Sequence, residues 1–457
     1  MASGDAAASA SPSDDEIGRR ALARTRRRLI PFLFVLYIVS YLDRINVGFA
    51  ALQMNADLGF SARVFGLGAG IFFLGYVLFE IPSNLALQRV GARRWIARIM
   101  ISWGIASSAM MFVQGPASFY ALRFVLGVGE AGFFPGMILY LTYWFPAAER
   151  ARAIAQFMTA TAIAGVIGGP LSGALLALDG RAGLAGWQWL FLVEGLPAVL
   201  LGIAVLRYLT DRPEDAAWLP PDEREWLVAR MREEHAARDQ IHGVGVSEMF
   251  KSATVWRLSF LWFCLVIGLY GISFWTPQIV RGFSGLSDFW VGVVSAVPYL
   301  VAAAGMVRVA AHSDRTQERR WHVALPAMAA VVGFLLSAWV TSPVPALAAL
   351  SLAALGLWGA LGPFWSMPTA FLGGTAAAAG IALINSVGNI GGFVGPFVLG
   401  WAKDATGSFS GGILVLALGG AVAAALALVG GDARAPRGDR VVETDSLVRG
   451  EGGQGQD

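Results

Sequence analysis

The chain has 457 residues, of which 56% are hydrophobic and 14% are charged, and its mean hydropathy is +0.60. This composition excludes an ordinary soluble globular protein and is typical of a polytopic membrane protein. The formal net charge of +3 does not indicate a nucleic-acid partner, because in a membrane protein the positions of Lys and Arg matter more than their sum.

The N-terminal segment, residues 1–28, is predicted to be a cytoplasmic tail. Its first 16 residues consist mainly of Ala, Ser and Asp without an apolar period, a pattern typical of disorder. A basic stretch comes next, directly before the first apolar run; its arginines are Arg19, Arg20, Arg24, Arg26, Arg27 and Arg28. Because no short apolar core with a cleavage pattern follows, we expect an uncleaved first span, not a signal peptide.

Apolar windows near the ~20 residues that cross ~30 Å of hydrocarbon then recur along the chain. They lie at 29–50, 64–87, 95–113, 117–144, 152–177, 188–209, 256–280, 290–311, 322–341, 344–372, 379–402 and 411–430. No strand pattern is seen, and only helices and closed barrels satisfy their backbone in lipid. The predicted fold class is all-α integral membrane, with about twelve transmembrane helices in two six-helix halves.

The predicted domains follow from these windows. The N-terminal half covers 29–209 and the C-terminal half covers 256–430. A polar connector, 210–255, is expected to contain a short charged helix, and the tail 431–457 is expected to be disordered. Most Lys and Arg residues fall in the tails, the connector and alternate loops. By the positive-inside rule both termini and the connector are cytoplasmic, in a multi-pass protein of the inner membrane.

The two halves repeat one another at an offset of about 228 residues, which indicates two parallel six-helix units. At this offset Tyr270 of the C-terminal half aligns with Tyr41 of the N-terminal half. The repeat fails at the most polar point of the first span, where Asp43 and Arg44 correspond to Ile272 and Ser273. Charge at membrane depth is therefore expected in the N-terminal half.

Four charged residues inside apolar runs are candidates for function. Asp43 and Arg44 lie in the first span; Arg123 and Glu130 lie in the fourth, seven residues apart and hence on one helix face. Two guanidiniums can hold a carboxylate, and two buried carboxylates can exchange protons. The alternative is an ion-pair network that only fixes helix packing, although ionisable residues inside membranes are usually functional.

Uncharged polar residues of the C-terminal half suit the hydroxyls of a ligand. Asn385 and Asn389 are one turn apart in the eleventh span, and Tyr270 and Gln278 lie in the seventh. Interhelical hydrogen bonds or interfacial packing are the alternatives. Glu80 and Glu194 lie near predicted span ends, where their side chains are expected to reach water.

Enzyme signatures are missing from the sequence. No Cys or His cluster has metal-ligand spacing, and no P-loop or dinucleotide-binding G-x-G-x-x-G opens a helix. We expect no metal, no cofactor and no enzyme activity, with the proton gradient as the energy source.

The chain resembles a major facilitator superfamily transporter, specifically the anion:cation symporter family, which includes tartrate, galactonate, phthalate and hydroxyphenylacetate permeases. The resemblance rests on four motifs: Tyr41 to Asn46, Phe79 to Asn84, Arg123 to Glu130 and Ile384 to Asn389. It implies that Arg44 binds the substrate carboxylate beside Tyr41, and that Asn389 contacts the ligand. It further implies that Asp43 and Glu130 carry the protons and that Arg123 tunes them.

The resemblance also implies two charged gate loops. After the second span, Gln88 replaces the usual Asp, which indicates a weakened or differently paired gate; the remaining signature residues are Arg89, Gly91, Arg93 and Arg94. After the eighth span, Asp314 and Arg315 keep the pattern.

The predicted function is proton-coupled import of a small organic anion, such as a sugar acid, tartrate or an aromatic carboxylate, by alternating access. The expected partners are this anion, protons and the lipid bilayer, with no nucleic acid, and the protein is expected to be monomeric. An exporter or uniporter of another small molecule is the alternative within transport. A membrane sensor that binds a carboxylate without transporting it is the alternative of a different class.

Overall fold

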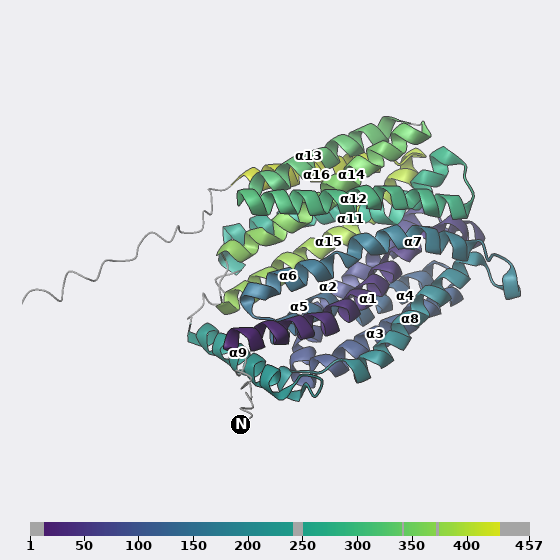
Figure 1. The fold of residues 1–457 in the computed structure, drawn as a ribbon. Helices are drawn as coiled ribbons and strands as arrows, with labels where there is room; N and C mark the ends of the chain where they lie inside the picture. The colour runs from purple at the N-terminus through teal and green to yellow at the C-terminus, as the bar shows by residue number, and fades with distance from the viewer. Residues whose placement is uncertain (1–12, 241–249, 341, 372–373, 430–457) are drawn as a thin grey trace, which may run out of the picture.

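The computed structural model describes residues 13–240, 250–340, 342–371 and 374–429. Within these residues, twelve helical segments are long and apolar enough to cross a membrane, which confirms the predicted fold class. Figure 1 shows the C-terminal half, drawn in green and yellow, stacked on the N-terminal half, drawn in purple to teal.

The N-terminal half contains α1 (Asp14–Asp57), α2 (Ala62–Val90), α3 (Ala92–Ala109), α4 (Pro116–Glu130), α5 (Phe133–Trp144), α6 (Ala147–Met158), α7 (Ala160–Leu176) and α8 (Gly186–Tyr208). The C-terminal half contains α11 (Ala253–Ser284), α12 (Asp288–Thr316), α13 (Arg320–Trp339), α14 (Pro343–Phe371), α15 (Gly374–Thr406) and α16 (Ser410–Leu428). The connector contains α9 (Pro221–Gln240). Short 3₁₀ turns are η1 (Met110–Phe112), η2 (Arg181–Gly183) and η3 (Pro213–Asp215).

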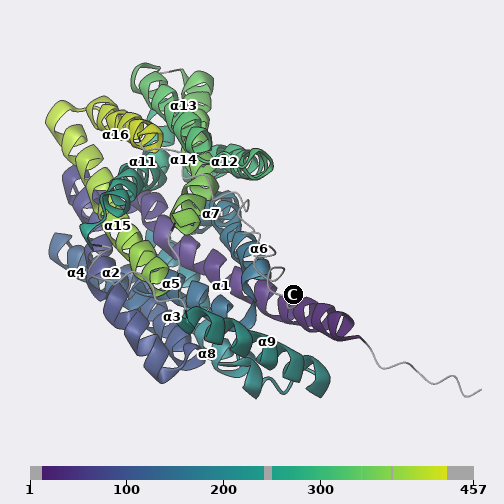
Figure 2. The ribbon, with the colours of Figure 1, turned by 90° about the vertical axis from the view of Figure 1, so that its left-hand side faces the viewer.

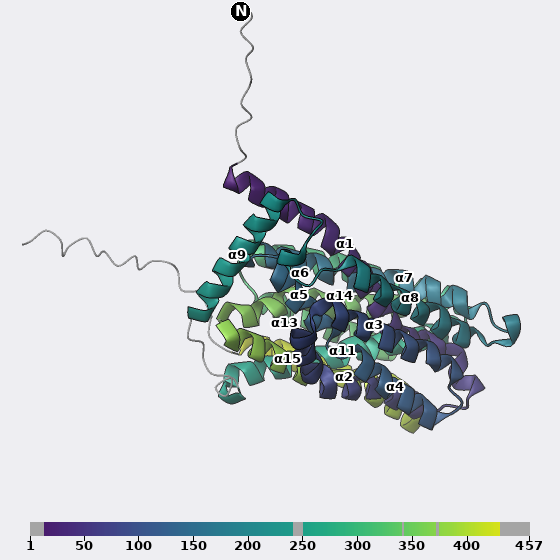
Figure 3. The same cartoon turned by 90° about the horizontal axis from the view of Figure 1, so that it is seen from below.

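Helix α1 begins at Asp14, well before the first apolar run, so residues 14–28 of the predicted tail are helical. Acidic residues occupy the first turn of α1, where they complement the positive end of the helix dipole. The arginines that follow bind α9: Arg24 Nε lies 2.9 Å from Glu223, and Arg20 lies 3.6 Å from Asp222. Figure 3 shows α9 beside the start of α1. The tail predicted to be disordered at 431–457, and residues 1–12 of the predicted N-terminal disorder, fall outside the described residues.

The two halves meet at the end of the bundle where α1 ends and α2 begins, which we call the distal end. There Gln53 of α1 donates a hydrogen bond to Asp288 of α12 over 2.8 Å. The backbone N–H groups of Ala62 and Arg63, at the start of α2, donate to Asp404 of α15 at 3.0 and 2.8 Å. Helix α9 lies at the opposite end, which faces the viewer in Figure 2.

A glycine pair allows a close approach of the two halves. Gly169 of α7 and Gly292 of α12 face each other, and a Cβ atom on either would overlap the carbonyl oxygen of the other. Small residues at such positions let helix backbones pack closely. The contact therefore depends on the absence of a side chain at both positions.

We predict that Gly169→Ala lowers the apparent melting temperature of the detergent-purified protein. Overpacking a close contact costs roughly 1–3 kcal/mol. The matched control is Gly282→Ala on α11, where an added Cβ meets no atom within 4 Å. This control should leave stability unchanged or raise it slightly, since Ala favours a helix over Gly by roughly 0.5–1 kcal/mol. Equal melting temperatures for the two variants would contradict the predicted contact.

Candidate functional site

Asp43 and Arg44 are adjacent on α1 but point to different neighbours, because consecutive residues of a helix are rotated by about 100°. Asp43 faces α3 and accepts hydrogen bonds from Trp103 Nε1 and Ser107 Oγ, both at 2.7 Å. It also accepts one from Asn46 at 3.3 Å. Although adjacent in the sequence, Asp43 and Arg44 therefore have separate partners.

Arg44 joins the two halves. It forms an ion pair with Glu130 at the end of α4, and its Nη1 donates to the hydroxyl of Tyr270 on α11 over 2.9 Å. Ser40 Oγ donates a second hydrogen bond to Glu130 at 3.0 Å. The guanidinium also lies 5.4 Å from the ring centres of Phe72 and Tyr76, close enough for a cation–π interaction. Its Nε is buried and has no hydrogen-bond partner in the part of the chain that the structure describes.

Arg123 has a different environment from the one expected. It is fully buried and donates to the backbone carbonyls of Gly68 and Ala69 on α2, at 3.2 and 3.0 Å. Its guanidinium lies 5.0 Å from the ring centre of Phe72. No ion pair joins Arg123 to Glu130 within the described residues, although the two lie on one helix face. Its role in tuning the acids stays a prediction.

The uncharged candidates have different environments. Tyr270 contacts it directly. The Tyr41 hydroxyl and the Gln278 Nε2 are buried without hydrogen-bond partners. Asn385 and Asn389 of α15 are buried, and Asn385 donates to Glu80. The structure therefore brings together Arg44, Glu130 and Tyr270, whereas Asn385 belongs to a second contact.

The prediction that Glu80 and Glu194 reach water is wrong. Glu80 is 3% exposed and Glu194 is 4% exposed. Glu80 accepts hydrogen bonds from the C-terminal half, and Glu194 accepts one from Ser172 at 2.8 Å. An ionisable residue inside a long apolar helix indicates a functional site. The sequence analysis did not assign these two glutamates a function because both lie near predicted span ends.

Trp103, Ser107 and Tyr76 also belong to the site and were missed. Tryptophan and tyrosine in a span look like core or interfacial residues, and a single serine carries no signal. Only the packing of α2 and α3 against α1 shows which of them face a charge.

The gate loop of the N-terminal half uses an acid from the connector. Gly91 has a φ of 97°, a conformation that favours glycine, and Asp211 accepts a hydrogen bond from the Arg93 backbone N–H at 2.8 Å. Asp211 also lies 3.8 Å from the Arg93 side chain. Arg89 and Arg94 are exposed. Arg93 of this loop is thus paired with an acid of the connector, and the gating role of the loop stays a prediction.

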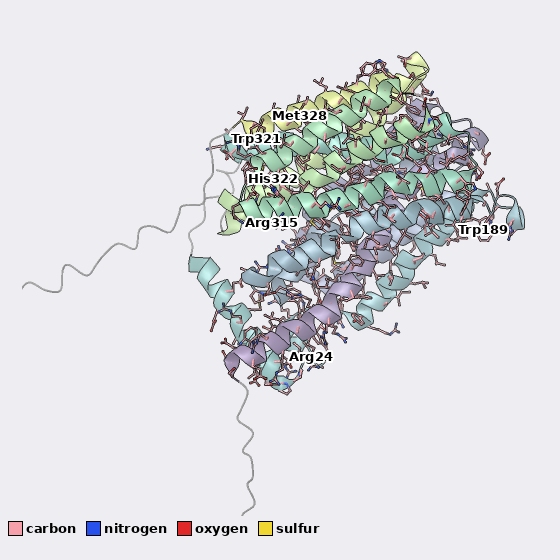
Figure 4. The ribbon with its side chains drawn as sticks, turned by 45° about the horizontal axis from the view of Figure 1, so that its top comes forward. Arg24, Trp189, Arg315, Trp321, His322 and Met328 are labelled. Carbon is pink, nitrogen blue, oxygen red and sulfur yellow. The ribbon has the colours of Figure 1, made fainter. Side chains whose placement is uncertain are left out.

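The gate loop of the C-terminal half is paired within itself. Asp314 binds Arg319 at 2.6 Å, and Arg315 is exposed. Partial burial acts against ionisation of Glu318, but hydrogen bonds from the Trp321 backbone and from His322 lower its pKa below the usual value. Figure 4 places Arg315, Trp321 and His322 at the same end of the bundle as Arg24, with Trp189 at the distal end.

The buried charges of the N-terminal spans do not balance. Four acids and two arginines are buried there: Asp43, Glu80, Glu130, Glu194, Arg44 and Arg123. Because unpaired charge is costly in hydrocarbon, a surplus of carboxyl groups favours proton binding at this site. Among the described residues no group of His, Cys, Asp and Glu could hold a metal ion. The arrangement therefore suits anion and proton binding.

Comparisons with known proteins identify the family. The model of the Major Facilitator Superfamily matches residues 33–396. The chain belongs to this superfamily. A "Putative tartrate transporter" of Agrobacterium vitis is 54% identical over 407 residues, covering 88% of this chain and 93% of the relative.

Two further similarities bear on the transporter. A "Quinolone resistance transporter" of Acinetobacter baumannii is 43% identical over 391 residues, covering 86% of this chain and 90% of the relative. The crystal structure of a bacterial homologue of the human lysosomal transporter Spinster, inward-facing and unoccupied, has a TM-score of 0.71 at 19% identity. It covers 88% of this chain and 96% of that chain, and it supports the fold alone. The protein is thus a multi-pass secondary transporter and not an enzyme.

We predict that the bond between Trp103 and Asp43 stabilises the transporter. Trp103→Phe removes a donor to a buried carboxylate, so it should cost roughly 1–3 kcal/mol, and this loss should shrink in an Asp43→Asn background. The measurement is the apparent melting temperature of the four proteins. Trp262→Phe is the matched control, because the Trp262 Nε1 is buried without a partner. An equal loss in both backgrounds would refute the interaction.

Proposed function

We propose that this transporter is a proton-coupled symporter that imports a small organic anion of the tartrate or sugar-acid class by alternating access. The observation that carries the proposal is the environment of Arg44. Its guanidinium contacts an acid of one half and a tyrosine hydroxyl of the other, and its Nε has no partner. A carboxylate that enters between the halves can take this free donor and form the bidentate contact that arginine favours.

Glu130 and Asp43 serve as the proton-linked acids in this proposal. A proton on Glu130 removes the negative charge that holds Arg44, so the guanidinium becomes available to the substrate carboxylate. Asp43 has hydroxyl, indole and amide donors and, among the described residues, no basic partner. Protonation of the Asp43 carboxylate removes its negative charge. Arg123 acts at longer range, as a fixed positive charge on the helix that carries Glu130.

The substrate hydroxyls are assigned to the uncharged polar residues. Tyr41 and Gln278 each have a buried polar atom without a partner, which a hydroxylated anion can satisfy. Tyr270 is already at Arg44, and Asn385 and Asn389 are one helical turn apart on α15. These residues are the proposed contacts from both halves.

The proposed orientation places both termini, the connector and the two gate loops in the cytoplasm of a cell with this protein in its inner membrane. The basic residues that support it, Arg24 and Arg315, lie at one end of the bundle (Figure 4). The distal end, where the halves meet, then faces outward. We propose that one chain is the functional unit, because each half supplies part of the site.

A second candidate is export of a drug-like carboxylic acid, and the similarity to the quinolone resistance transporter favours it. Quinolone antibacterials carry a carboxylate, so a buried arginine suits them as well as tartrate. The two candidates differ in ligand size and in the direction of transport.

We predict different losses for the acid and arginine variants in proteoliposomes. With an imposed pH gradient, Asp43→Asn and Glu130→Gln should lose uphill tartrate accumulation while keeping most downhill exchange. Arg44→Ala should lose both, because the substrate carboxylate has lost its guanidinium. Radiolabelled uptake and counterflow measure the two activities.

The control for Arg44→Ala is Arg181→Ala, an exposed arginine of the distal loop between α7 and α8. It should keep both activities. Full accumulation by the Asp43, Glu130 and Arg44 variants together would contradict the proposed mechanism.

We predict that tartrate raises the apparent melting temperature of the purified transporter and that Arg44→Ala abolishes the shift. A ligand at 100 times its Kd stabilises the folded state by about 2.7 kcal/mol. A carboxylate panel that includes a quinolone separates the two candidates. Stabilisation by the quinolone and not by tartrate or any sugar acid would favour the second.

A further inference from the structure

Helices α2 and α15 form a continuous contact between the halves. Going from the distal end along α2, Gly66 packs on Pro396, Gly70 on Phe393 and Phe73 on Gly392. The partner numbers fall as those of α2 rise, so the two helices run antiparallel. This contact ends in a polar group, about 27 Å along α2 from its first residue at 1.5 Å per residue, where Glu80 meets Asn385.

Glu80 binds side chains of the other half with both of its oxygens. Asn385 Nδ2 donates to Oε1 at 2.6 Å, and Ser386 Oγ donates to Oε2 at 2.9 Å. From its own half, Asn84 donates to the Glu80 backbone carbonyl and not to the carboxylate. No Lys or Arg forms an ion pair with Glu80 within the described residues. We call Glu80, Asn385 and Ser386 the inter-half cluster.

This arrangement links the solvation of a buried acid to the position of the opposite half. Hydrogen bonds to a charged acceptor are the strong ones, and a carboxylate left without donors in a low-dielectric interior is costly. If α15 moves away from α2, Glu80 loses both donors at once. The apolar contacts of Gly66 and Gly70 have no comparable directional requirement.

We propose that Glu80 is a positioning residue that, through Asn385 and Ser386, stabilises the conformation in which the two halves meet at the distal end. The inference rests on the proposed function, because alternating access requires these halves to separate there. Asn385 is also a proposed substrate contact, so a ligand that takes its amide competes with Glu80 and weakens the inter-half cluster.

Glu194 provides a matched control for a buried acid. It is as buried as Glu80, but Ser172, which donates to it, lies on α7 of the same half. Removing Glu194 therefore disturbs a buried carboxyl group without touching the contact between the halves.

The test measures distal closure by disulfide cross-linking in the full-length protein in native membranes. Gln53→Cys and Asp288→Cys replace two side chains that touch across the halves, in a Cys264→Ala background that removes the native thiol. We expect Glu80→Ala and Asn385→Ala each to slow cross-linking by about tenfold or more, the scale of a lost hydrogen bond to a charged group. The double variant should be no slower than the singles, and Glu194→Ala should match the background.

Three results would overturn the proposal: unchanged cross-linking in both single variants, additive losses in the double variant, or an equal loss in Glu194→Ala. Glu80→Gln keeps the size of the side chain and one acceptor, so it should fall between Ala and the native residue. If Glu80→Ala does not fold, the cross-linking rate of Glu80→Gln tests the proposal in its place. Tartrate uptake by the unmodified protein is assayed in parallel: its absence refutes the proposed function alone, and unchanged cross-linking refutes this inference alone.

Discussion

The structure depends on the need to give every buried charge a partner in a medium that solvates it poorly. The N-terminal spans bury four carboxyl groups and two guanidiniums, whereas no Asp, Glu, Lys or Arg is buried among the described residues of the C-terminal half. One ion pair, Arg44 with Glu130, is formed within this set. The remaining acids are held by hydroxyl, indole and amide donors, so their charge is dispersed but not cancelled.

This asymmetry has a consequence for motion between the halves. The C-terminal half approaches the buried charges with neutral groups: the Tyr270 hydroxyl at Arg44, and Asn385 and Ser386 at Glu80. When the halves separate, these neutral groups can bind water, whereas Glu80 loses both of its donors. The ion pair stays intact within one half. Movement therefore breaks hydrogen bonds at membrane depth without separating opposite charges there.

Much of the fold followed from the sequence, because apolar length and the placement of Lys and Arg are local properties of the chain. Asp43, Arg44, Arg123 and Glu130 could be found for the same reason. Their partners could not, since these depend on how the helices are rotated against one another. Asp43 accepts a hydrogen bond from Trp103, and Arg123 donates to backbone carbonyls. The helical start of α1 was missed; its arginines pair with acids of α9, which lies far along the chain.

The two buried arginines illustrate why residue type alone does not assign a role. Arg123 donates to carbonyls of α2, which are fixed parts of a helix backbone, so its bonds persist as long as α2 and α4 pack together. Arg44 is held by two side chains, one ionisable and one from the opposite half, and keeps a free Nε. Both of its partners can leave, through protonation or through movement of the halves. These exchangeable contacts, more than its charge, support the proposal that Arg44 binds the substrate.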